Sequence, residues 1–144
     1  MRLQGLNRVA LVVDDEPFAR LSALQVLIDQ AYHVLEAADA AEALDLLDRN
    51  DDISVVVTDI NMPGSMDGLT MARHLRTRHS GMALVVASGA VRPALAELPH
   101  GAEFLQKPYA AQALLRCVRE AEEAVDPGRP VTDPGPWPVG KARE

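Results

Sequence analysis

The stretch Ile53-Ser54-Val55-Val56-Val57-Thr58-Asp59 is an apolar run that ends abruptly in a carboxylate, and Asn61-Met62-Pro63-Gly64 follows it. A nearly continuous run of β-branched residues is typical of a strand that is buried on both faces of a parallel sheet. Open α/β sheets place their ligand chemistry at the carboxyl ends of such strands. Asp59 is therefore the first candidate for a functional residue.

Three other apolar runs end in polar residues in the same way. Val9 to Val13 is followed by the acidic pair Asp14-Asp15, Met82 to Ala87 by Ser88, and Ala102 to Gln106 by Lys107-Pro108. If all four runs are parallel strands, three carboxylates, one hydroxyl and one ammonium meet at one edge of the sheet. This combination suits the transfer of a phosphoryl group to a carboxylate in the presence of a divalent cation.

Helical patterns separate the apolar runs along the chain. They begin near Pro17, Asp39 and Asp67, and a last one spans Ala110 to Val125, while Tyr32 to Glu36 indicates a further short strand. This alternation predicts an α/β fold of the (βα)5 type, a flavodoxin-like, doubly wound, five-stranded parallel sheet with strand order 2-1-3-4-5. In that order the first and third strands are neighbours, which would bring the three carboxylates together.

The fourth helix of this fold should be short. Only 18 residues separate Ser88 from Lys107, and they must hold a loop, a helix and most of a strand. The helix candidate, Arg92 to Leu98, is bracketed by Pro93 and Pro99. A proline removes a backbone donor and disfavours helical geometry in the residue before it, so Pro99 should end the helix.

The composition indicates one domain followed by a proline-rich tail. The chain has 144 residues, of which 48% are hydrophobic and only 3% aromatic, so we expect an aliphatic core. Residues 126–144 hold five of the ten prolines and little that could form a core. We therefore expect a domain over residues 1–125 and a disordered tail over 126–144. As an alternative, the tail is a docking peptide anchored by Trp137.

The charge and the cysteine content restrict the partners and the compartment. A formal charge of −7 argues against nucleic-acid binding, which needs clustered Lys and Arg. The single cysteine, Cys117, permits no internal disulfide and suits a reducing compartment. No apolar stretch approaches the roughly 18 residues that span a membrane, and Val9 to Val13 is too short for a secretory signal. We expect a soluble cytoplasmic protein that binds neither nucleic acid nor a membrane.

Together these motifs resemble those of the receiver domain of two-component response regulators. The resemblance covers about residues 7–125, and the segments that carry it are Asp14-Asp15, Asp59-Ile60-Asn61-Met62-Pro63, Ser88-Gly89-Ala90 and Lys107-Pro108-Tyr109. It implies a phosphorelay in which Asp59 accepts a phosphoryl group from a phosphohistidine on a sensor histidine kinase or a histidine phosphotransfer protein. Such a protein is a signalling receiver, not an enzyme, although it catalyses its own phosphorylation and dephosphorylation.

The resemblance also implies a magnesium site. Mg²⁺ would be the cofactor, bound by Asp15, Asp59 and the backbone carbonyl of Asn61, while Asp14 would act mainly through water. Hard divalent cations of this kind prefer oxygen ligands and often bridge to a phosphate.

Three further residues take roles from the resemblance. Ser88 and Lys107 would contact the phosphoryl group. We hypothesise that Ser88 moves towards it and that Phe104, which matches the family's switch aromatic, turns into the vacated space. An ordinary core role for Phe104 in the fifth strand is the alternative. The changed surface would bind an unidentified downstream protein, and a homodimer is left open.

The chain departs from the family pattern beyond its short fourth helix. The loop from Pro63 to Gly68 is about one residue longer than the commonest form. We expect no DNA-binding output domain, and hence signalling through a partner protein. Two other functions fit parts of the pattern. One is an aspartate-nucleophile phosphatase. That family places its nucleophile and its acid/base residue two residues apart after the first strand, and Asp14-Asp15-Glu16 does not match this spacing well. The other is a phosphorylation-independent interaction module with a receiver fold.

Overall fold

The computed structural model describes residues 8–64, 66–89 and 93–125, and the proline-rich segment 126–144 with Trp137 lies outside this described part. Its elements, in chain order, are β1 Val9–Val13, α1 Pro17–Asp29, β2 His33–Ala37, α2 Ala40–Arg49, β3 Ile53–Asp59, α3 Gly68–Arg78, β4 Ala83–Ser88, the 3-10 helix η2 Leu95–Glu97, β5 Glu103–Gln106 and α4 Ala111–Ala124. Within it, no helix combines the length and the hydrophobicity needed to cross a membrane.

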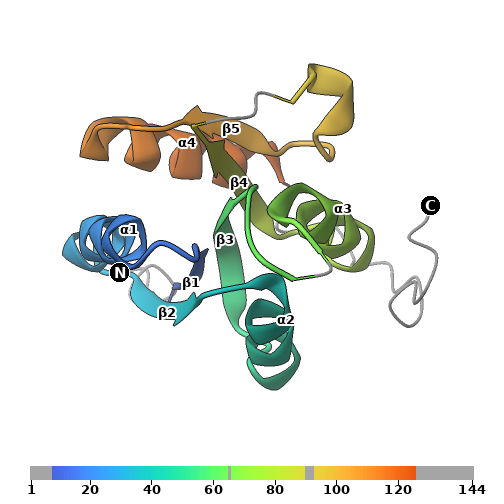
Figure 1. Ribbon diagram of the computed structural model, residues 1–144, viewed down its shortest axis with the longest axis horizontal. Coiled ribbons are helices and arrows are strands. Elements are labelled where there is room, and N and C mark those ends of the chain that lie inside the picture. Colours follow the sequence, from blue (N-terminus) through green and yellow to red (C-terminus); the bar gives the residue numbers. More distant parts are fainter. Residues whose placement is uncertain (1–7, 65, 90–92, 126–144) are drawn as a thin grey trace.

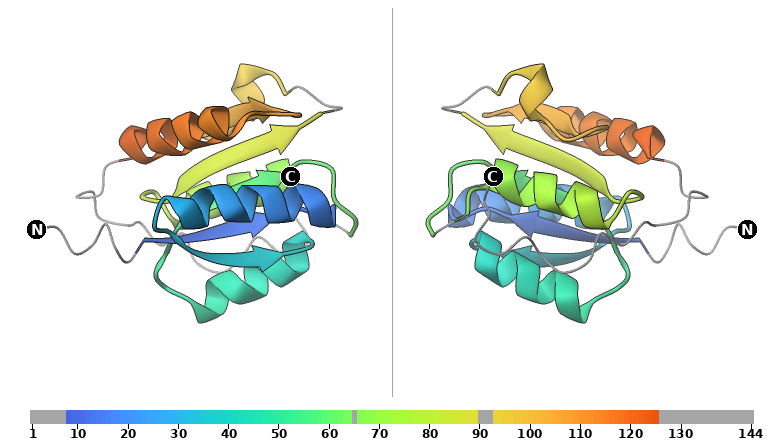
Figure 2. Two further views of the ribbon diagram at one scale, coloured as in Figure 1. Left: turned by 90° about the vertical axis from the view of Figure 1, so that its left-hand side faces the viewer. Right: turned by 90° about the vertical axis from the view of Figure 1, so that its right-hand side faces the viewer.

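The five strands form one parallel sheet in the order β2-β1-β3-β4-β5, which confirms the predicted topology. In Figure 2 the strand arrows accordingly point towards the same end of the molecule. Val13 pairs with Thr58, and Asp59 pairs with Ala87, so the ends of β1, β3 and β4 lie level with one another. This register brings the polar residues that follow the strands to a single edge.

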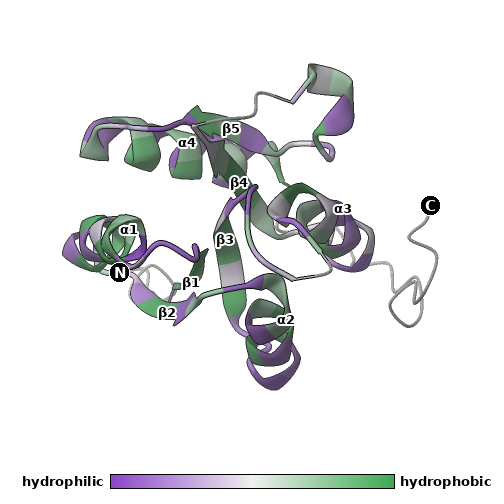
Figure 3. Ribbon diagram, viewed as in Figure 1, coloured by the Kyte–Doolittle hydropathy of each residue, from purple (hydrophilic) through white to green (hydrophobic). Residues whose placement is uncertain are grey.

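Two aliphatic layers cover the faces of the sheet. Helices α1 and α4 lie on one side, and α2 and α3 on the other (Figure 1). The central strand β3 alternates between the layers: Val56 contributes to the α2 and α3 side, and Val55 and Val57 to the opposite side. Figure 3 shows the hydrophobic residues concentrated on the strands, while α2 and α3 carry hydrophilic residues away from the sheet. Burial of aliphatic side chains on both faces explains the continuous apolar sequence of β3.

Side-chain caps start three of the helices. The carboxylate of Asp39 accepts a hydrogen bond from the Glu42 N–H (2.8 Å), and Asp67 accepts one from the Thr70 N–H (2.8 Å). Glu16 does the same for α1, where its carboxylate accepts from Ala19 N–H at 2.9 Å. These contacts satisfy N–H groups that have no partner within the helix, and they fix where each helix begins.

Helix α1 buries a different stripe from the one that its leucine spacing suggests. Leu21 and Ile28 recur at helical spacing, but they are 53% and 47% exposed, and Phe18 is 79% exposed. The buried residues of α1 are instead Ala23 and Leu27. The helix is apolar on most sides, so its periodicity does not distinguish the core face from the outer face. An exposed apolar stripe on α1 is the result.

The connection between β4 and β5 holds no α-helix in its described residues. The predicted helix from Arg92 to Leu98 is reduced to the three residues of η2, Leu95–Glu97. Pro99 follows two residues later, and the Ala102 N–H donates to its carbonyl oxygen at 3.0 Å, which closes a turn before β5 begins. The short helix expected between β4 and β5 is therefore confirmed, and η2 is shorter than the predicted range.

Helix α3 is pressed against the end of β3 at Gly68. The Gly68 N–H donates to the Ile60 carbonyl at 2.9 Å. A Cβ at position 68 would overlap the Asp59 carbonyl oxygen, and it would lie 2.8 Å from both the Asp59 carbonyl carbon and Thr58 Oγ1. Only glycine lets the helix approach the strand this closely.

Replacing Gly68 with alanine should therefore destabilise the domain. We expect Gly68→Ala to lower the free energy of unfolding by about 1–3 kcal/mol, the usual cost of overpacking, as measured by urea denaturation. Gly81→Ala is the matched control, because a Cβ there would have no atom within 4 Å. Equal losses of stability in the two variants would contradict the contact.

Candidate functional site

The acidic residues predicted to converge do so at the carboxyl edge of the sheet. Asp14 and Asp15 follow β1, and Asp59 ends the neighbouring strand β3. Each of the three offers a carboxylate oxygen, and these oxygens lie within 4.8 Å of one another. Asp14 and Asp59 are buried, whereas Asp15 is exposed. The cluster is thus open on the side of Asp15 and closed on the other.

Lys107, which follows β5, completes the charged centre. Its ammonium donates to Asp14 Oδ2 at 2.8 Å and lies 3.4 Å from Asp59 Oδ1. Asp14 Oδ1 also accepts a hydrogen bond from the Glu16 N–H at 2.9 Å, so the carboxylate of Asp14 is held from two sides. The Lys107 N–H donates to the Ser88 carbonyl at 3.0 Å, which links this residue to the end of β4.

Burial and charge shift the pKa values in this centre. Burial raises the pKa of Asp59. The Lys107 ammonium lowers this pKa and the carboxylates of Asp14 and Asp15 raise it, and the net result is a pKa above the ordinary value for an aspartate. Burial alone would lower the pKa of Lys107, but its hydrogen bond to Asp14 and the charges of Asp14 and Asp59 raise it. The ammonium is therefore firmly charged, while the acidic cluster keeps an excess of negative charge.

The donor set suits a divalent cation. Three carboxylates face one ammonium, so repulsion among them remains; burial is the main cause of the raised pKa of Asp59, and the charges of Asp14 and Asp15 add to it. A hard divalent ion would relieve that repulsion through oxygen ligands, and Asp15 presents an exposed carboxylate to it. Of the predicted ligands, Asn61 lies two residues beyond Asp59 in the exposed start of the next loop, and its carbonyl remains a prediction.

Ser88 and Phe104 lie on the neighbouring strands β4 and β5. Ser88 is fully buried at the end of β4, one residue beyond the partner of Asp59 in the sheet register. Phe104 is partly buried in β5, pairs with Val86 of β4, and packs against the core on the α2 and α3 side. The structure thus brings Ser88 to the edge that holds Asp59, and it places Phe104 two residues deeper along β4.

An apolar cavity opens beside Lys107. Its volume is about 530 Å³, and it is lined by Ala19, Ser22, Gly89, Lys107, Pro108 and Tyr109. The first turns of α1 therefore form one wall of it. The exposed side chain of Phe18 is on the same part of this helix. A partner that approaches Asp59 along α1 would meet an apolar surface next to the charged centre.

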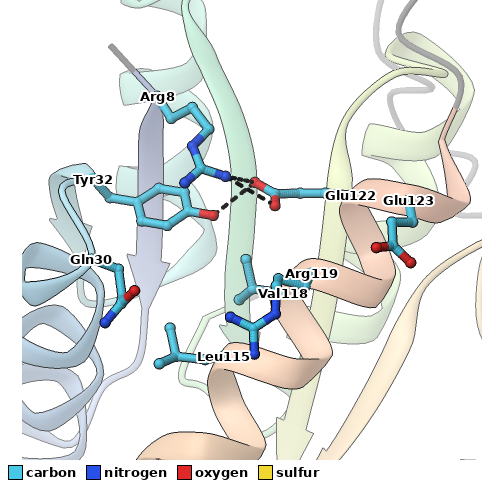
Figure 4. Close-up of a pocket in the computed structure, with 8 residues that line it drawn as sticks. All are labelled: Arg8, Gln30, Tyr32, Leu115, Val118, Arg119, Glu122 and Glu123. Carbon is cyan, nitrogen blue, oxygen red and sulfur yellow. Dashed lines mark hydrogen bonds and ion pairs between the residues drawn. The ribbon is translucent and has the colours of Figure 1, made fainter. Parts of the chain in front are cut away.

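A second cavity, of about 290 Å³, lies between α4 and the end of α1 (Figure 4). Two of its charged groups are paired with each other: Glu122 accepts from Arg8 at 3.0 and 3.1 Å, and it also accepts from the Tyr32 hydroxyl at 2.8 Å. The Arg8 guanidinium also stacks over the Tyr32 ring, 4.1 Å from its centre. Burial raises the pKa of Tyr32, and Glu122 raises it further, so the hydroxyl stays protonated and donates. This cluster joins β1, β2 and α4 and has a structural role.

Sequence reasoning missed Gly68 and the Arg8–Tyr32–Glu122 cluster. Gly68 follows the cap residue Asp67, and that position alone gives no sign of its contact with Asp59. The members of the cluster are 24 to 114 residues apart in the chain, and none of them belongs to a motif. Only the tertiary packing could identify them.

Comparison with known proteins assigns the family. Residues 10–119 match the model of the response regulator receiver domain. The chain therefore belongs to the response regulator receiver domain family, whose members act in two-component signalling. This confirms the resemblance seen in the motifs.

The curated relatives include longer proteins. The chain is 36% identical over 124 residues to the sensor kinase CckA of Brucella abortus (strain 2308), covering 83% of this chain and 13% of that protein. It is 38% identical over 112 residues to the response regulator MprA of Mycobacterium sp. (strain KMS), covering 76% of this chain and 48% of MprA. The chain thus spans less than half the length of these relatives.

Solved structures of receiver domains share the fold. A response regulator receiver protein from Sinorhizobium medicae WSM419 aligns with a TM-score of 0.74 and 28% identity over 82% of this chain and 96% of its own. The receiver domain of the hybrid histidine kinase CckA aligns with a TM-score of 0.66 and 31% identity over 79% of this chain and 98% of its own. These structures have the length of a single receiver domain.

The raised pKa of Asp59 predicts an unusual stability profile. A carboxyl whose pKa is higher in the folded than in the unfolded state costs stability when it is ionised. Without Mg²⁺, Asp59→Asn should therefore raise the free energy of unfolding at pH 7. The gain should vanish as the pH falls below the ordinary carboxyl range, where both states hold the proton.

Urea denaturation in EDTA across this pH range measures the effect. Asp52→Asn, at the other end of β3, is the control and should change the midpoint little. An Asp59→Asn variant that is less stable than the wild type at pH 7 would contradict the cost of ionising the buried Asp59 carboxylate.

Proposed function

We propose that Asp59 accepts a phosphoryl group from a phosphohistidine of a sensor histidine kinase or histidine phosphotransfer protein, and that phosphorylation changes partner binding. The observation that carries this proposal is the position of Asp59. Its buried carboxylate lies in a cluster with Asp14 and Asp15, 3.4 Å from the Lys107 ammonium. A carboxylate nucleophile, a cation site and a fixed positive charge are what phosphoryl transfer to aspartate requires.

The transfer step uses these groups directly. A carboxylate oxygen of Asp59 attacks phosphorus, the donor's P–N bond breaks, and its electron pair goes to the imidazole nitrogen. Lys107 stabilises negative charge on the transferring group, because its ammonium is already held in place by Asp14. When bound to Asp14, Asp15, Asp59 and the Asn61 carbonyl, Mg²⁺ would neutralise charge on the phosphoryl oxygens. In this proposal, hydrolysis of the product restores Asp59, and no separate substrate is turned over.

The proposed switch uses Ser88 and Phe104. A phosphoryl group adds charge and three acceptor oxygens, and new hydrogen bonds to Ser88 and Lys107 would draw the end of β4 towards Asp59. Phe104 lies on the neighbouring strand, opposite Val86, and would turn as Ser88 moves. The surface near β4 and β5 then differs between the two states, and a downstream protein binds one of them.

Asp59→Asn should abolish phosphorylation. We expect acetyl phosphate with Mg²⁺ to add one phosphoryl group to the wild type and none to Asp59→Asn, as measured by intact-mass spectrometry. Lys107→Met should slow the reaction by on the order of 10²-fold, the usual cost of losing one charge-stabilising donor.

Asp52→Asn is the control and should label at the wild-type rate. Equal labelling of Asp59→Asn would remove the acceptor assignment. Repeated turnover of a phosphate ester would favour the aspartate-nucleophile phosphatase instead.

The proposed docking face for the phosphodonor is the exposed side of α1. Phe18 and Leu21 are 79% and 53% exposed there, although large apolar side chains are normally buried. Ala19 and Ser22 of the same turns line the apolar cavity beside Lys107. A protein donor seated on this face would bring its phosphohistidine to the edge of the sheet that holds Asp59.

Phe18→Ser should separate protein donors from small donors. We expect phosphotransfer from the cognate kinase or phosphotransfer protein to slow at least about tenfold, as for loss of an aromatic interface residue. Labelling by acetyl phosphate should be unchanged. Ile28→Ser, also exposed but at the far end of α1, is the matched control. Equal slowing with both donors would place the effect of Phe18 inside the domain.

A further inference from the structure

Arginines of α3 hold the short connection between β4 and β5. We call residues 93–102, which include the gold turn η2 in Figure 1, the tethered segment. Arg73 Nε donates to the Glu97 carbonyl at 2.9 Å, and Arg76 Nε donates to the His100 carbonyl at 2.8 Å. Two consecutive turns of α3 thus bind the tethered segment through its backbone.

Arg76 also binds the loop between α3 and β4. Its Nη1 donates to the carbonyl of Met82 at 2.7 Å, and to those of His79 and Ser80 at 3.2 Å each. One planar guanidinium therefore joins the residue before β4 to the turn before β5. Gly101 has a φ of +79°, and a Cβ there would lie 3.7 Å from Arg76 Nη2, so the turn passes close to the arginine.

The other end of α3 touches the phosphoacceptor. Gly68 packs on the Asp59 carbonyl and donates to the Ile60 carbonyl. About 12 Å of helix separates Gly68 from Arg76 at 1.5 Å per residue. Met71 and Leu75 are fully buried on this length, so α3 is fixed against the core. A displacement of the end of β3 would be transmitted along a rigid element.

We propose that α3 couples phosphorylation of Asp59 to the conformation of the tethered segment, with Arg76 as the positioning residue. This inference rests on the proposed function and adds a route of regulation to it. The route runs from the Asp59 backbone through Gly68 and α3 to the carbonyls that Arg76 holds. It is separate from the route through Ser88 and Phe104. The tethered segment is then part of the surface that a partner protein reads.

Hydrogen exchange tests the coupling in the full 144-residue chain. The probes are two amides inside the tethered segment: Glu97 N–H, which donates to Ala94 at 2.9 Å, and Ala102 N–H, which donates to Pro99 at 3.0 Å. Beryllofluoride with Mg²⁺ serves as the mimic of the phosphorylated state. In the wild type we expect it to change exchange at both amides by about fivefold or more, as is typical of allosteric coupling.

Arg76→Gln should markedly reduce this response and leave the site intact. The hydrogen-exchange rates of the Ile60 and Lys107 amides should still change when beryllofluoride binds, and acetyl phosphate should still label Asp59. Arg49→Gln, on α2, is the matched control and should respond like the wild type, because Arg49 pairs only with the exposed Asp45 among the described residues. Arg73→Gln removes a single hydrogen bond from an exposed arginine. It should show a weakened response, and it decides the question if Arg76→Gln does not fold.

Three outcomes would overturn the inference. The first is a wild-type site that responds to beryllofluoride while Glu97 and Ala102 do not. The second is an unchanged response in Arg76→Gln, or in Arg73→Gln where it is the deciding variant, which would leave these arginines with a structural role only. The third is a wild type in which even Ile60 and Lys107 are unaffected and Asp59 is not labelled; this result also contradicts the proposed function, and so differs from the other two.

Discussion

The contact of the Lys107 ammonium with the carboxylates of Asp14 and Asp59 is the interaction on which the site depends. These residues lie at the ends of three different strands, so the contact exists only if β1, β3 and β5 run parallel and end level. One ammonium cannot neutralise three clustered carboxylates, and burial raises the pKa of Asp59 although Lys107 lowers it. An ionised carboxylate in this buried acidic cluster is unfavourable, and a divalent cation would relieve that cost. The fold supplies this arrangement, and the proposed phosphoryl transfer would use it.

The opposite edge of the sheet shows what the same residue types do when their charges are balanced. There Arg8, Tyr32 and Glu122 satisfy one another, and the phenol keeps its proton because burial and Glu122 raise its pKa. This cluster ties α4 to β1 and β2 and leaves no excess charge for a ligand. At the carboxyl edge the charges are unequal, and Asp15 is open to solvent. The difference between the two edges separates a structural cluster from a reactive one.

Most of the sheet and the charged centre could be predicted because each rests on a local pattern. An apolar run that ends in Asp59, and another that ends before Asp14, indicate both the strand and the side chain at its end. The buried face of α1 could not be predicted, because its apolar residues surround the helix and Leu21 lies outside the core. The roles of Gly68 and Arg76 could not be predicted for another reason. Both act through backbone carbonyls that only the tertiary structure brings near, and a sequence pattern contains no information on them.

The short helix η2 between β4 and β5 and the role of Arg76 have a common cause. Prolines leave too few residues between β4 and β5 for an α-helix, so this connection packs against the core through Leu98 and Ala102 and not through the face of a helix. It also offers backbone carbonyls, and the Arg76 guanidinium binds the His100 carbonyl of this connection together with the Met82 carbonyl before β4. Hydrogen bonds of this kind are directional, whereas helix packing tolerates small shifts. A chain that replaces a packed helix with directional contacts to α3 makes the connection follow α3, whose first residue lies on Asp59.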